Sequence, residues 1–464
     1  MRLVTSLFLR KNIYSMNNKL LKDLCLCALL LAPATQGMAQ TQPVHKALYD
    51  FVVPDNGDFK AALAAADKRP DTSKRFRIFI KQGNYVIPAN KKKMVEGTDG
   101  KKYPSATTYL SSPNVSIIGE DRDKVVLVNT VPTNFVDTKW GSQCPLEGIG
   151  RGDVLYMDTT AKNTYFQDFT MKSGMPDKTG RNIVLNDNGD KTICKNMCLW
   201  AFQDTYVSHN ENSRYYFEGG VLRGRTDFLC GKGDVYYNKV ELLVSDAGYI
   251  AVPSVPRKYG YIFQNCVIKD GSVKKDINKR YTLGRPWGMG TPIALFINTT
   301  MEVIPSDVGW NEMHGGYPKR FAEYNSHTVD GKLVDLSHRK LGYEAFDKHA
   351  KVDDPKMHHM EYNYPVLSKD EAAQYTLETV MGGDDHWNPT HYTRQAPLPT
   401  EVKLNGKKLT WADNDQVLCW AVCKDGKVIG FTTKPQFSVK NSKASYAVRA
   451  ANEMGGLSEA VEAK

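Results

Sequence analysis

The sequence predicts an all-β protein, in which a right-handed parallel β-helix is followed by a small antiparallel β-sandwich. Between Val52 and about Met360, short apolar runs alternate with Gly, Asn and Asp, and long helical periodicity is nearly absent. A series of sandwiches would also fit such short strands. We favour the β-helix because tight Asn-Gly and Asp-Gly hairpin signals are few and because Asn recurs beside the apolar runs.

Local patterns predict the individual elements of this region. Strands are expected at residues 77–80, 115–118, 154–157 and 261–268, where apolar residues dominate. One early helix is predicted from Phe59 to Ala66. A second, short helix is predicted to begin after Ser368, because Ser368 and Glu371 have the spacing of a capping box.

From Val402 the pattern changes to compact alternation, which is typical of antiparallel strands. These strands are expected at residues 409–411, 417–422, 427–431 and 446–450, with Asp425-Gly426 as a hairpin turn. The ending from Ala451 to Ser458 resembles the last strand of a fibronectin type III-like sandwich. The predicted domains are a signal peptide (1–39), a β-helix (40–390), a linker (391–400) and the sandwich (401–464).

Composition places the chain among ordinary globular proteins. Apolar residues make up 41% of its 464 residues and charged residues 24%, which excludes a disordered or fibrous chain. The formal net charge is +10, of which the first 39 residues contribute a surplus of four, leaving about +6 for the rest. A mildly basic globule attracts acidic polysaccharides and nucleic acids alike, so charge alone does not identify the partner.

The N-terminus has the pattern of a secretory signal peptide. Lys19 and Lys22 precede an apolar run over residues 24–32, and Gly37-Met38-Ala39 offers small residues where a signal peptidase cleaves. We expect cleavage near Ala39 and export to the periplasm or the extracellular medium. No later segment is apolar for long enough to be expected to span a membrane.

Cysteine usage argues against a disulfide scaffold and against a zinc site. Two of the nine cysteines lie in the predicted signal peptide, and the remaining seven are an odd number in a large chain. No pair has metal-ligand spacing with a second pair to complete it. We expect most of these thiols to be buried as small apolar side chains.

Three segments carry the chemical information. They are Gln203-Asp204-Thr205, Asp227-Phe228-Leu229-Cys230-Gly231 and Leu283-Gly284-Arg285-Pro286-Trp287. Each alone is weak evidence, because aspartates in surface turns are common. Together, in this order and spacing, they resemble the signature of the pectin methylesterases, a family of carbohydrate esterases built on a right-handed parallel β-helix. The resemblance covers roughly residues 48–390.

The resemblance implies a role for each side chain. Asp227 would be the nucleophile that attacks a methyl ester carbonyl, and Asp204 would protonate the departing methanol and then activate water. Arg285 would keep the nucleophile ionised, which splits the pKa values of the two carboxyls. Gln203 would donate a hydrogen bond to the tetrahedral oxyanion. Trp287 would offer an apolar face to a sugar ring.

The resemblance also implies a substrate class and a set of partners. The expected reaction is hydrolysis of methyl esters on galacturonate residues of a pectic polysaccharide, either methylated polygalacturonate or rhamnogalacturonan. No metal or organic cofactor is expected, nucleic acid is not an expected partner, and the chain is expected to be a monomer. Thr205, Arg181 and Asn182 are the further residues expected to contact the substrate.

One position departs from the family's pattern. The family places a second glutamine twenty-two residues before Gln203, where this chain has Arg181. Arg181 or Asn182 could still supply N–H groups to an oxyanion, and an arginine could grip a substrate carboxylate with two hydrogen bonds. Two alternatives stay open: a pectate or pectin lyase on the same type of β-helix, and a catalytically weakened pectin-binding protein.

Overall fold

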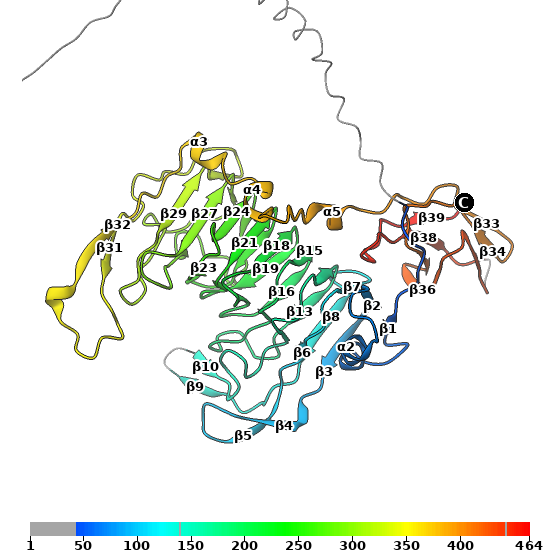
Figure 1. Cartoon of the computed structure of the whole chain (residues 1–464), viewed down its shortest axis with the longest axis horizontal. Coiled ribbons are helices and arrows are strands. Elements are labelled where there is room, and N and C mark those ends of the chain that lie inside the picture. Colours follow the sequence, from blue (N-terminus) through cyan, green and yellow to red (C-terminus); the bar gives the residue numbers. More distant parts are fainter. Residues whose placement is uncertain (1–42, 139–140, 441–442) are drawn as a thin grey trace, which may run out of the picture. The chain divides into compact units, whose positions relative to one another are not determined.

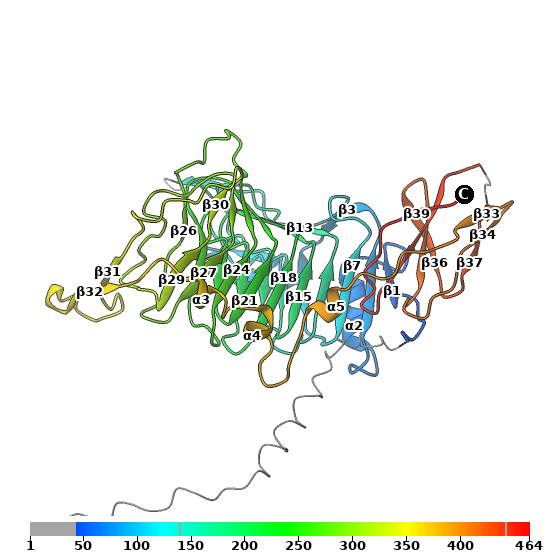
Figure 2. The ribbon, with the colours of Figure 1, turned by 90° about the horizontal axis from the view of Figure 1, so that it is seen from above.

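The computed structural model describes residues 43–138, 141–440 and 443–464, so the predicted signal peptide lies outside the described residues. Most of this part of the chain winds into successive coils whose short strands line up in long parallel sheets (Figure 1, Figure 2). We name the ten-stranded sheet I, the nine-stranded sheet II and the seven-stranded sheet III. The predicted fold class, a parallel β-helix, is confirmed.

Neighbouring strands within each of these sheets are parallel and come from successive coils. Sheet I contains β1 (Phe51–Val53), β2 (Phe76–Ile80), β7 (Val115–Gly119), β12 (Tyr165–Gln167), β15 (Thr192–Lys195), β18 (Arg214–Glu218), β21 (Asp234–Asn238), β24 (Tyr261–Gln264), β27 (Ile293–Ile297) and β29 (Arg320–Tyr324). Sheet II contains β3 (Gly83–Ile87), β8 (Val125–Asn129), β13 (Thr170–Lys172), β16 (Cys198–Trp200), β19 (Val221–Gly224), β22 (Glu241–Val244), β25 (Val267–Asp270), β28 (Thr300–Met301) and β30 (His327–Thr328). Sheet III contains β6 (Tyr109–Leu110), β11 (Leu155–Met157), β14 (Leu185–Asp187), β17 (Tyr206–Ser208), β20 (Leu229–Gly231), β23 (Tyr249–Pro253) and β26 (Thr282–Gly284).

A single left-handed residue turns the chain from sheet I to sheet II on most coils. Asp168, Asn196, Asn265, Asn298 and Asn325 follow their sheet I strands with φ values of 47° to 59°. Asn and Asp tolerate this conformation because their short polar side chains bond to nearby backbone groups. The recurrence of Asn in the sequence therefore marks a corner of the β-helix.

Aromatic rings and the carboxyl of Asp187 lie inside the coils. The rings of Tyr237, Phe263 and Phe296 stack with centroids 4.6 and 4.2 Å apart and nearly parallel planes. The carboxyl is that of Asp187, which is fully buried and accepts a hydrogen bond from Gly189 N. Its second oxygen has no hydrogen-bond partner among the described residues. Burial raises the pKa of Asp187 to about 7.

One early α-helix, one later 3-10 helix and three hairpins surround the coils. Helix α2 (Phe59–Lys68), capped by the Asp58 side chain, follows β1 as predicted. The hairpins are β4 (Asn90–Glu96) with β5 (Lys102–Ser105), β9 (Val136–Thr138) with β10 (Gly141–Gln143), and β31 (Gly342–Ala345) with β32 (His359–Tyr362). The 3-10 helix η1 (Pro355–Met357) lies between β31 and β32. Among the described residues, no helix combines the length and apolar character needed to cross a membrane.

After β32 the chain runs back along the outer face of sheet I toward the first coils (Figure 1). Short helices α3 (Lys369–Ala372), α4 (Leu377–Met381) and α5 (Thr390–Thr393) lie on this path. The predicted capping box is present, because Ser368 and Glu371 exchange side-chain and backbone hydrogen bonds. The path is fixed to the coils by Arg214, whose guanidinium donates to both oxygens of Asp385 at 2.7 and 2.9 Å.

The C-terminal strands form two antiparallel sheets. One contains β33 (Lys403–Asn405), β34 (Lys408–Thr410) and β37 (Gln436–Ser438); the other contains β35 (Trp420–Lys424), β36 (Lys427–Thr432), β38 (Tyr446–Ala450) and β39 (Val461–Glu462). The predicted turn joins β35 to β36, with φ values of 49° at Asp425 and 76° at Gly426. These values match the mirror-image turn that suits the twist of a two-residue hairpin.

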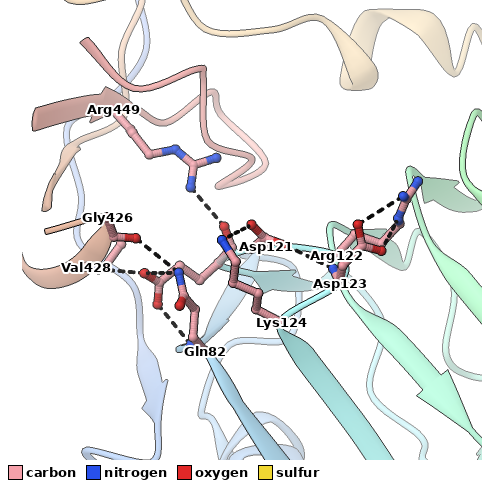
Figure 3. Close-up of polar contacts among 9 residues, drawn as sticks. Gln82, Asp121, Arg122, Asp123, Lys124, Gly426, Val428 and Arg449 are labelled. Atoms are coloured by element: carbon pink, nitrogen blue, oxygen red, sulfur yellow. Dashed lines mark hydrogen bonds and ion pairs between the residues drawn. The ribbon is translucent and has the colours of Figure 1, made fainter. Parts of the chain in front are cut away.

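The C-terminal strands pack on the first coils, beside β1 in both views (Figure 1, Figure 2). Buried side chains from the two parts, among them Leu418 and Ile118, belong to one apolar cluster. Figure 3 shows the polar contacts that accompany it. The buried Glu120 carboxylate accepts hydrogen bonds from Gln82 N at 2.9 Å and Val428 N at 2.6 Å. Arg449 donates to the Glu120 carbonyl at 2.8 Å.

Three local predictions differ from the structure. The strand predicted over 261–268 is two strands, β24 and β25, because the left-handed residue Asn265 turns the chain between them. The predicted linker holds part of a helical turn, α5. The strand predicted over 451–458 is wrong: the Asn452 side chain accepts from Met454 N and Gly456 N, which closes a turn, and the last strand is β39.

Candidate active site

Three successive coils place Asn182, Asp204 and Asp227 in equivalent positions between sheets II and III. Parallel backbone bridges join the residues that immediately precede them on the three coils. Asp204 precedes β17 and Asp227 precedes β20, and these two strands are hydrogen-bonded neighbours. Because neighbouring strands lie about 5 Å apart, the backbones of the two aspartates are separated by roughly that distance.

The two aspartates share a conformation as well as a position. Their φ values are 55° and 52°, in the left-handed region that few residues other than Gly, Asn and Asp adopt readily. The two residues are 6% and 5% exposed. Strained backbone at paired, buried carboxyls is a feature that clusters at functional sites.

Arg285 holds the Asp227 carboxylate with two parallel hydrogen bonds. Its Nε donates to Oδ1 at 3.0 Å and its second guanidinium nitrogen donates to Oδ2 at 2.5 Å. The guanidinium also lies over the ring of Tyr249, 4.1 Å from the centroid. A charged pair bound at both ends of a rigid fork is stronger and more directional than a single bond.

The environments of the two carboxyls differ. Burial raises the pKa of Asp204 well above its ordinary value, and the negative charge of Asp227 raises it further. Burial also raises the pKa of Asp227, but the hydrogen bonds and charge of Arg285 oppose that rise. The pair is therefore arranged to hold one proton, and Asp204 is the carboxyl that keeps it.

Gln203 stands beside the pair with a free side-chain amide. It is partly exposed, and within the described ranges its amide group has no hydrogen-bond partner. Its backbone is fixed by Asn182, whose Oδ1 accepts from Gln203 N at 2.9 Å and from Phe202 N at 3.1 Å. The Asn182 amide nitrogen is buried and unpartnered among the described residues. Asn182 thus positions the turn that carries Gln203 and Asp204.

Thr205 does not offer a surface to a ligand, contrary to the expectation that it contacts substrate. Its side chain is fully buried, and its hydroxyl donates to the Arg223 carbonyl at 2.9 Å. This bond ties the turn after Asp204 to the following coil. Thr205 is therefore a structural support for the pair.

Arg181 is exposed and lies on the Asn182 side of the pair. Its positive charge lowers the pKa of Asp204 and that of Glu147, in each case against the effect of burial. The loop before Arg181 is anchored, because Arg223 donates to both oxygens of Asp177 at 3.1 and 2.9 Å. An exposed cation on an anchored loop therefore lies close enough to Asp204 to affect its charge.

Trp287 packs against a small apolar cluster beside the carboxyls. The cluster contains Ile183, Val207, Cys230 and Val252, with Ile149, Trp287 and Met313 at its margin. Three of its members belong to one outward-facing row of sheet III, which we call the floor column. From the first coil onward the floor column is Tyr109, Tyr156, Asn186, Val207, Cys230 and Val252. Trp287 therefore lies at the margin of a buried apolar cluster that adjoins the aspartate pair.

A pocket of about 220 Å³ opens beside Trp287, and the loop between β31 and β32 forms one of its walls. That loop is closed by His358, whose ring nitrogens lie 2.9 Å from Glu344 Oε1 and 2.8 Å from Asp353 Oδ1. The His358 ring stacks on Phe346, which lines the pocket. The two carboxylates raise the pKa of His358.

Other side chains that could bind a metal or take part in acid–base chemistry are accounted for by packing. His209 is partly buried and bonds to Asn186 in the floor column. All seven cysteines after the predicted signal peptide are free and buried, as expected. Within the described residues, no group of three or more His, Cys, Asp or Glu side chains is arranged to hold a metal ion.

Sequence reasoning missed three neighbours of the carboxyls. Tyr249 supports Arg285, Arg225 lowers the pKa of Asp227 through its charge, and the Cys230 thiol lies against Asp204. The spacing of about one coil between successive motifs is the only signal that could have aligned Tyr249 and Arg225 with the site.

Comparisons with known proteins find similarity to pectinesterases. The pectinesterase family model matches residues 157–352, which include both aspartates and Arg285. Pectinesterase 2.1 of Solanum lycopersicum is 23% identical over 296 residues, covering 61% of this chain and 48% of the relative. Pectinesterase 1 of the same plant is 23% identical over 311 residues, covering 64% and 51%. The chain thus spans about half the length of these relatives.

Solved structures show the same fold. The pectin methylesterase from carrot has a TM-score of 0.52 at 16% identity, covering 75% of this chain and 96% of that protein. A pectin methylesterase from Aspergillus niger has a TM-score of 0.50 at 16% identity, covering 75% and 100%. At this identity the likeness establishes the β-helix and its coil arrangement only.

Proposed function

We propose that this chain, whose residues 157–352 match the pectinesterase family model, is a pectinesterase that hydrolyses methyl esters on galacturonate residues of a pectic polysaccharide. The observation that carries the proposal is the asymmetry of the aspartate pair. Arg285 grips Asp227 through two hydrogen bonds, while Asp204 is buried against it without such a partner. Ester hydrolysis by two carboxyls needs this difference, because one must begin ionised and the other protonated.

In the first half of the reaction, an Asp227 oxygen attacks the ester carbonyl carbon. The carbonyl oxygen becomes an oxyanion, which the free amide of Gln203 is placed to stabilise. The bond to the methoxy oxygen then breaks as Asp204 donates its proton, so methanol leaves and an acyl-enzyme remains. Asp204 is left as a carboxylate beside the covalently bound Asp227.

In the second half, the Asp204 carboxylate removes a proton from water, and the resulting hydroxide attacks the acyl carbon. The bond from that carbon to Asp227 breaks, releasing the uronic acid and restoring the Asp227 carboxylate. Arg285 then takes up its pairing again. Both residues have returned to their starting protonation states, so the cycle needs no co-reactant besides water.

Trp287, which is partly exposed, supplies the sugar-binding surface in this proposal. An indole at the end of an apolar row suits the flat face of a pyranose ring. Arg181 is placed to bind the carboxylate of a neighbouring, already de-esterified sugar. Its position near Asp204 also lets it stabilise negative charge that develops at the oxyanion.

Methanol release from methylated pectin tests the proposal. Asp204→Asn and Asp227→Asn should each reduce the initial rate at least a thousandfold, because each removes a group that takes part in bond making or breaking. Asp276→Asn is a matched control, since Asp276 pairs with Arg280 on the surface at 2.6 Å. Near wild-type turnover in either site variant would show that the mechanism is wrong.

The lyase alternative is disfavoured by the state of Arg285. Proton abstraction by an arginine requires a neutral guanidine. Burial alone would lower the pKa of Arg285, but its pairing with Asp227 raises the pKa above the ordinary value. A lyase would produce an unsaturated uronide that absorbs in the ultraviolet, whereas the esterase produces methanol. A weakened binding protein would bind pectin and produce neither.

We also propose that the protein is exported and that its C-terminal strands form a fibronectin type III-like module. Lys19, Lys22 and the apolar run after them support cleavage near Ala39, which N-terminal sequencing of the exported protein would test. The seven C-terminal strands divide into sheets of three and four, which supports a fibronectin type III-like module. A different strand connectivity in a crystal structure would remove that assignment.

A further inference from the structure

Four side chains form a row at one edge of sheet I, where the chain enters its strands. Extending the strand register by one or two residues aligns Arg75, Asn114, Asn163 and Lys191 on four successive coils. The last three have φ values of 53°, 57° and 59°, so they turn the chain in the left-handed conformation. Neighbouring members lie about 5 Å apart, as the strands of a sheet do. We call these four residues the corner row.

A pocket of about 290 Å³ opens beside the corner row. It is lined by Arg75, Asn114, Asn163, Thr164, Lys191, Ile193, Trp387, Tyr392 and Met454. The lining thus comes from the coils, from the segment that returns along sheet I and from the C-terminal part of the chain. Five of the nine residues are at least partly exposed, so a ligand can enter from solvent. The volume lies just below the range of drug-sized sites and suits one small ring.

Arg75 enters this pocket without a carboxylate partner. Its two terminal nitrogens donate to Ser116 Oγ at 3.2 Å and to the Asn163 carbonyl at 3.1 Å, which are both neutral acceptors, and it forms no ion pair with any described residue. Burial lowers the pKa of Arg75 to about 10, and the positive charge of Arg77 adds to this effect. The charge of Glu453 opposes it, but from an exposed side chain. A desolvated cation without a counter-ion favours the binding of an anion.

Lys191 brings a second positive charge to the pocket. Its Nζ lies 2.6 Å from Asp385 Oδ2, and Asp385 also accepts both hydrogen bonds from Arg214. Because two cations share this carboxylate, Asp385 does not neutralise Lys191 completely. No carboxylate belongs to the lining of the pocket. The pocket wall is therefore positively charged and suits one small anion.

Two neutral polar groups of the lining are free to bind a ligand. The Asn163 amide nitrogen donates to Asn114 Oδ1 at 3.2 Å, but Asn163 Oδ1 accepts no hydrogen bond within the described ranges. The Tyr392 hydroxyl likewise has no hydrogen-bond partner among the described residues. An amide oxygen can only accept, so it needs a donor such as a sugar hydroxyl. A ligand that carries both a carboxylate and hydroxyl groups would complement the cations and this oxygen together.

We propose that this pocket is a non-catalytic site for one free sugar acid, a pyranose that carries a single carboxylate. Arg75 binds the carboxylate through its remaining N–H groups, and Lys191 adds electrostatic attraction. Asn163 Oδ1 accepts a hydrogen bond from a ring hydroxyl, and Tyr392 packs against the ring. The pocket borders sheet I, whereas the aspartate pair lies between sheets II and III, so the inference goes beyond the proposed function and does not depend on it. A bound acid would tie the coils to the returning segment and to the C-terminal part of the chain.

Calorimetric titration with galacturonic acid, a monomer without an ester, tests the site directly. Asn163→Asp should weaken binding by about tenfold or more, because the new carboxylate would repel the ligand and neutralise Arg75. The matched control is Asn325→Asp, since Asn325 is also an exposed left-handed residue, with φ of 52°, and its amide donates to Asn298 Oδ1 at 2.9 Å. Unchanged affinity in Asn163→Asp, an equal loss in the control, or no binding by the wild type would overturn the proposal.

A second variant and two further ligands test the assigned contacts. Arg75→Gln should weaken binding by about tenfold or more, whereas Arg320→Gln, which removes a paired arginine of sheet I, should not. If Arg75→Gln does not fold, as its melting temperature would show, Asn163→Asp decides the test. Galactose, which has the ring without the carboxylate, and sulfate, which has charge without the ring, should each bind about tenfold more weakly than galacturonic acid. Equal affinity for sulfate would overturn the assignment of a sugar acid.

Hydrogen exchange and activity separate this site from the proposed catalysis. Saturating galacturonic acid should slow amide exchange in residues 387–392 and around Met454 in the wild type, but not in Asn163→Asp. Slowing confined to the strands around the aspartate pair would place the ligand in the active site and overturn the proposal. Asp204→Asn should keep wild-type affinity for the acid while it loses methanol release, and Asn163→Asp should keep methanol release. If the wild type binds the acid in the pocket but releases no methanol, the esterase proposal fails and this site stands.

Discussion

Replacing Arg285 with glutamine should shift the acid limb of the pH–rate profile to higher pH. The limb reports ionisation of the aspartate pair, and Asp227 must lose its proton before it can attack. Arg285 stabilises the charged form through hydrogen bonds of 3.0 and 2.5 Å. Without the guanidinium, the same carboxylate stays buried and ionises less readily.

The hydrogen-bond distances set the size of the shift. At an effective dielectric constant of about 20, opposite charges whose centres lie ~4 Å apart attract by about 4 kcal/mol, which equals about 3 pKa units. Water that enters the space left by the shortened side chain would restore part of the lost stabilisation of the Asp227 carboxylate. We therefore expect the acid limb to move up by about 1 to 3 pH units.

The basic limb should move in the same direction by less. It reports loss of the proton from Asp204, whose pKa Arg285 also lowers, but through charge alone and without a hydrogen bond. The pH range over which the enzyme is active should therefore become narrower and shift toward higher pH. Arg285→Lys keeps the positive charge but loses the pair of parallel hydrogen bonds. Its acid limb should therefore lie at a pH between those of the glutamine variant and the wild type.

The assay is kcat/KM for methanol release measured across the pH range for each variant. Arg320→Gln is the control, since Arg320 forms an ion pair with Glu371 at 3.0 Å on the outer face of sheet I. A lower rate with an unshifted acid limb would refute the reasoning, because Arg285 would then act by position or packing and not by holding Asp227 ionised.

Three further predictions follow from the described contacts. Gln203→Ala should lower kcat about a hundredfold to a thousandfold with little change in KM, if its amide binds the oxyanion only as charge develops, and initial rates on methylated pectin would check this. Only a protonated His358 can donate to both Glu344 and Asp353, and they raise its pKa, so the closed loop is favoured at low pH and lost as pH rises through that raised pKa. Limited proteolysis should therefore cut this loop faster at high pH, and His358→Gln should remove the pH dependence. Burial raises the pKa of Asp187 to about 7, so its contribution to stability is complete below the ordinary aspartate pKa and is lost as pH rises through about 7. The free energy of unfolding of Asp187→Asn, measured in urea, should change with pH by up to about 4 kcal/mol less than that of the wild type. An identical change with pH in both proteins would contradict this prediction.

The fold was predictable because its signals are local and repeated. Short apolar strands with Asn beside them follow from the coil geometry, and the capped helix after Ser368 and the turn at Asp425 depend on residues within a few positions of one another. The turn at Asn265 was missed because one left-handed residue between two apolar strands does not interrupt the apolar pattern. The turn after Ala451 was missed because a side chain, and not the backbone pattern, closes it.

The candidate site was predictable only as far as its ordered motifs reach. Those motifs placed Asp204, Asp227 and Arg285 together, and the structure brings them together. Burial was not readable from the motif, so Thr205 was expected to touch substrate although its hydroxyl faces the backbone of the next coil.

The packing of the C-terminal strands on the first coils affects the order in which parts of the molecule unfold. A stack of coils in which each contacts only its neighbours tends to fray from its ends. Here the first coils share an apolar cluster with strands from the other end of the chain, and Glu120 is bonded to both parts. Fraying at that end must therefore also melt the C-terminal strands. Unzipping should start instead at the coils around β29, and the first coils and the C-terminal strands should lose amide protection together in hydrogen exchange.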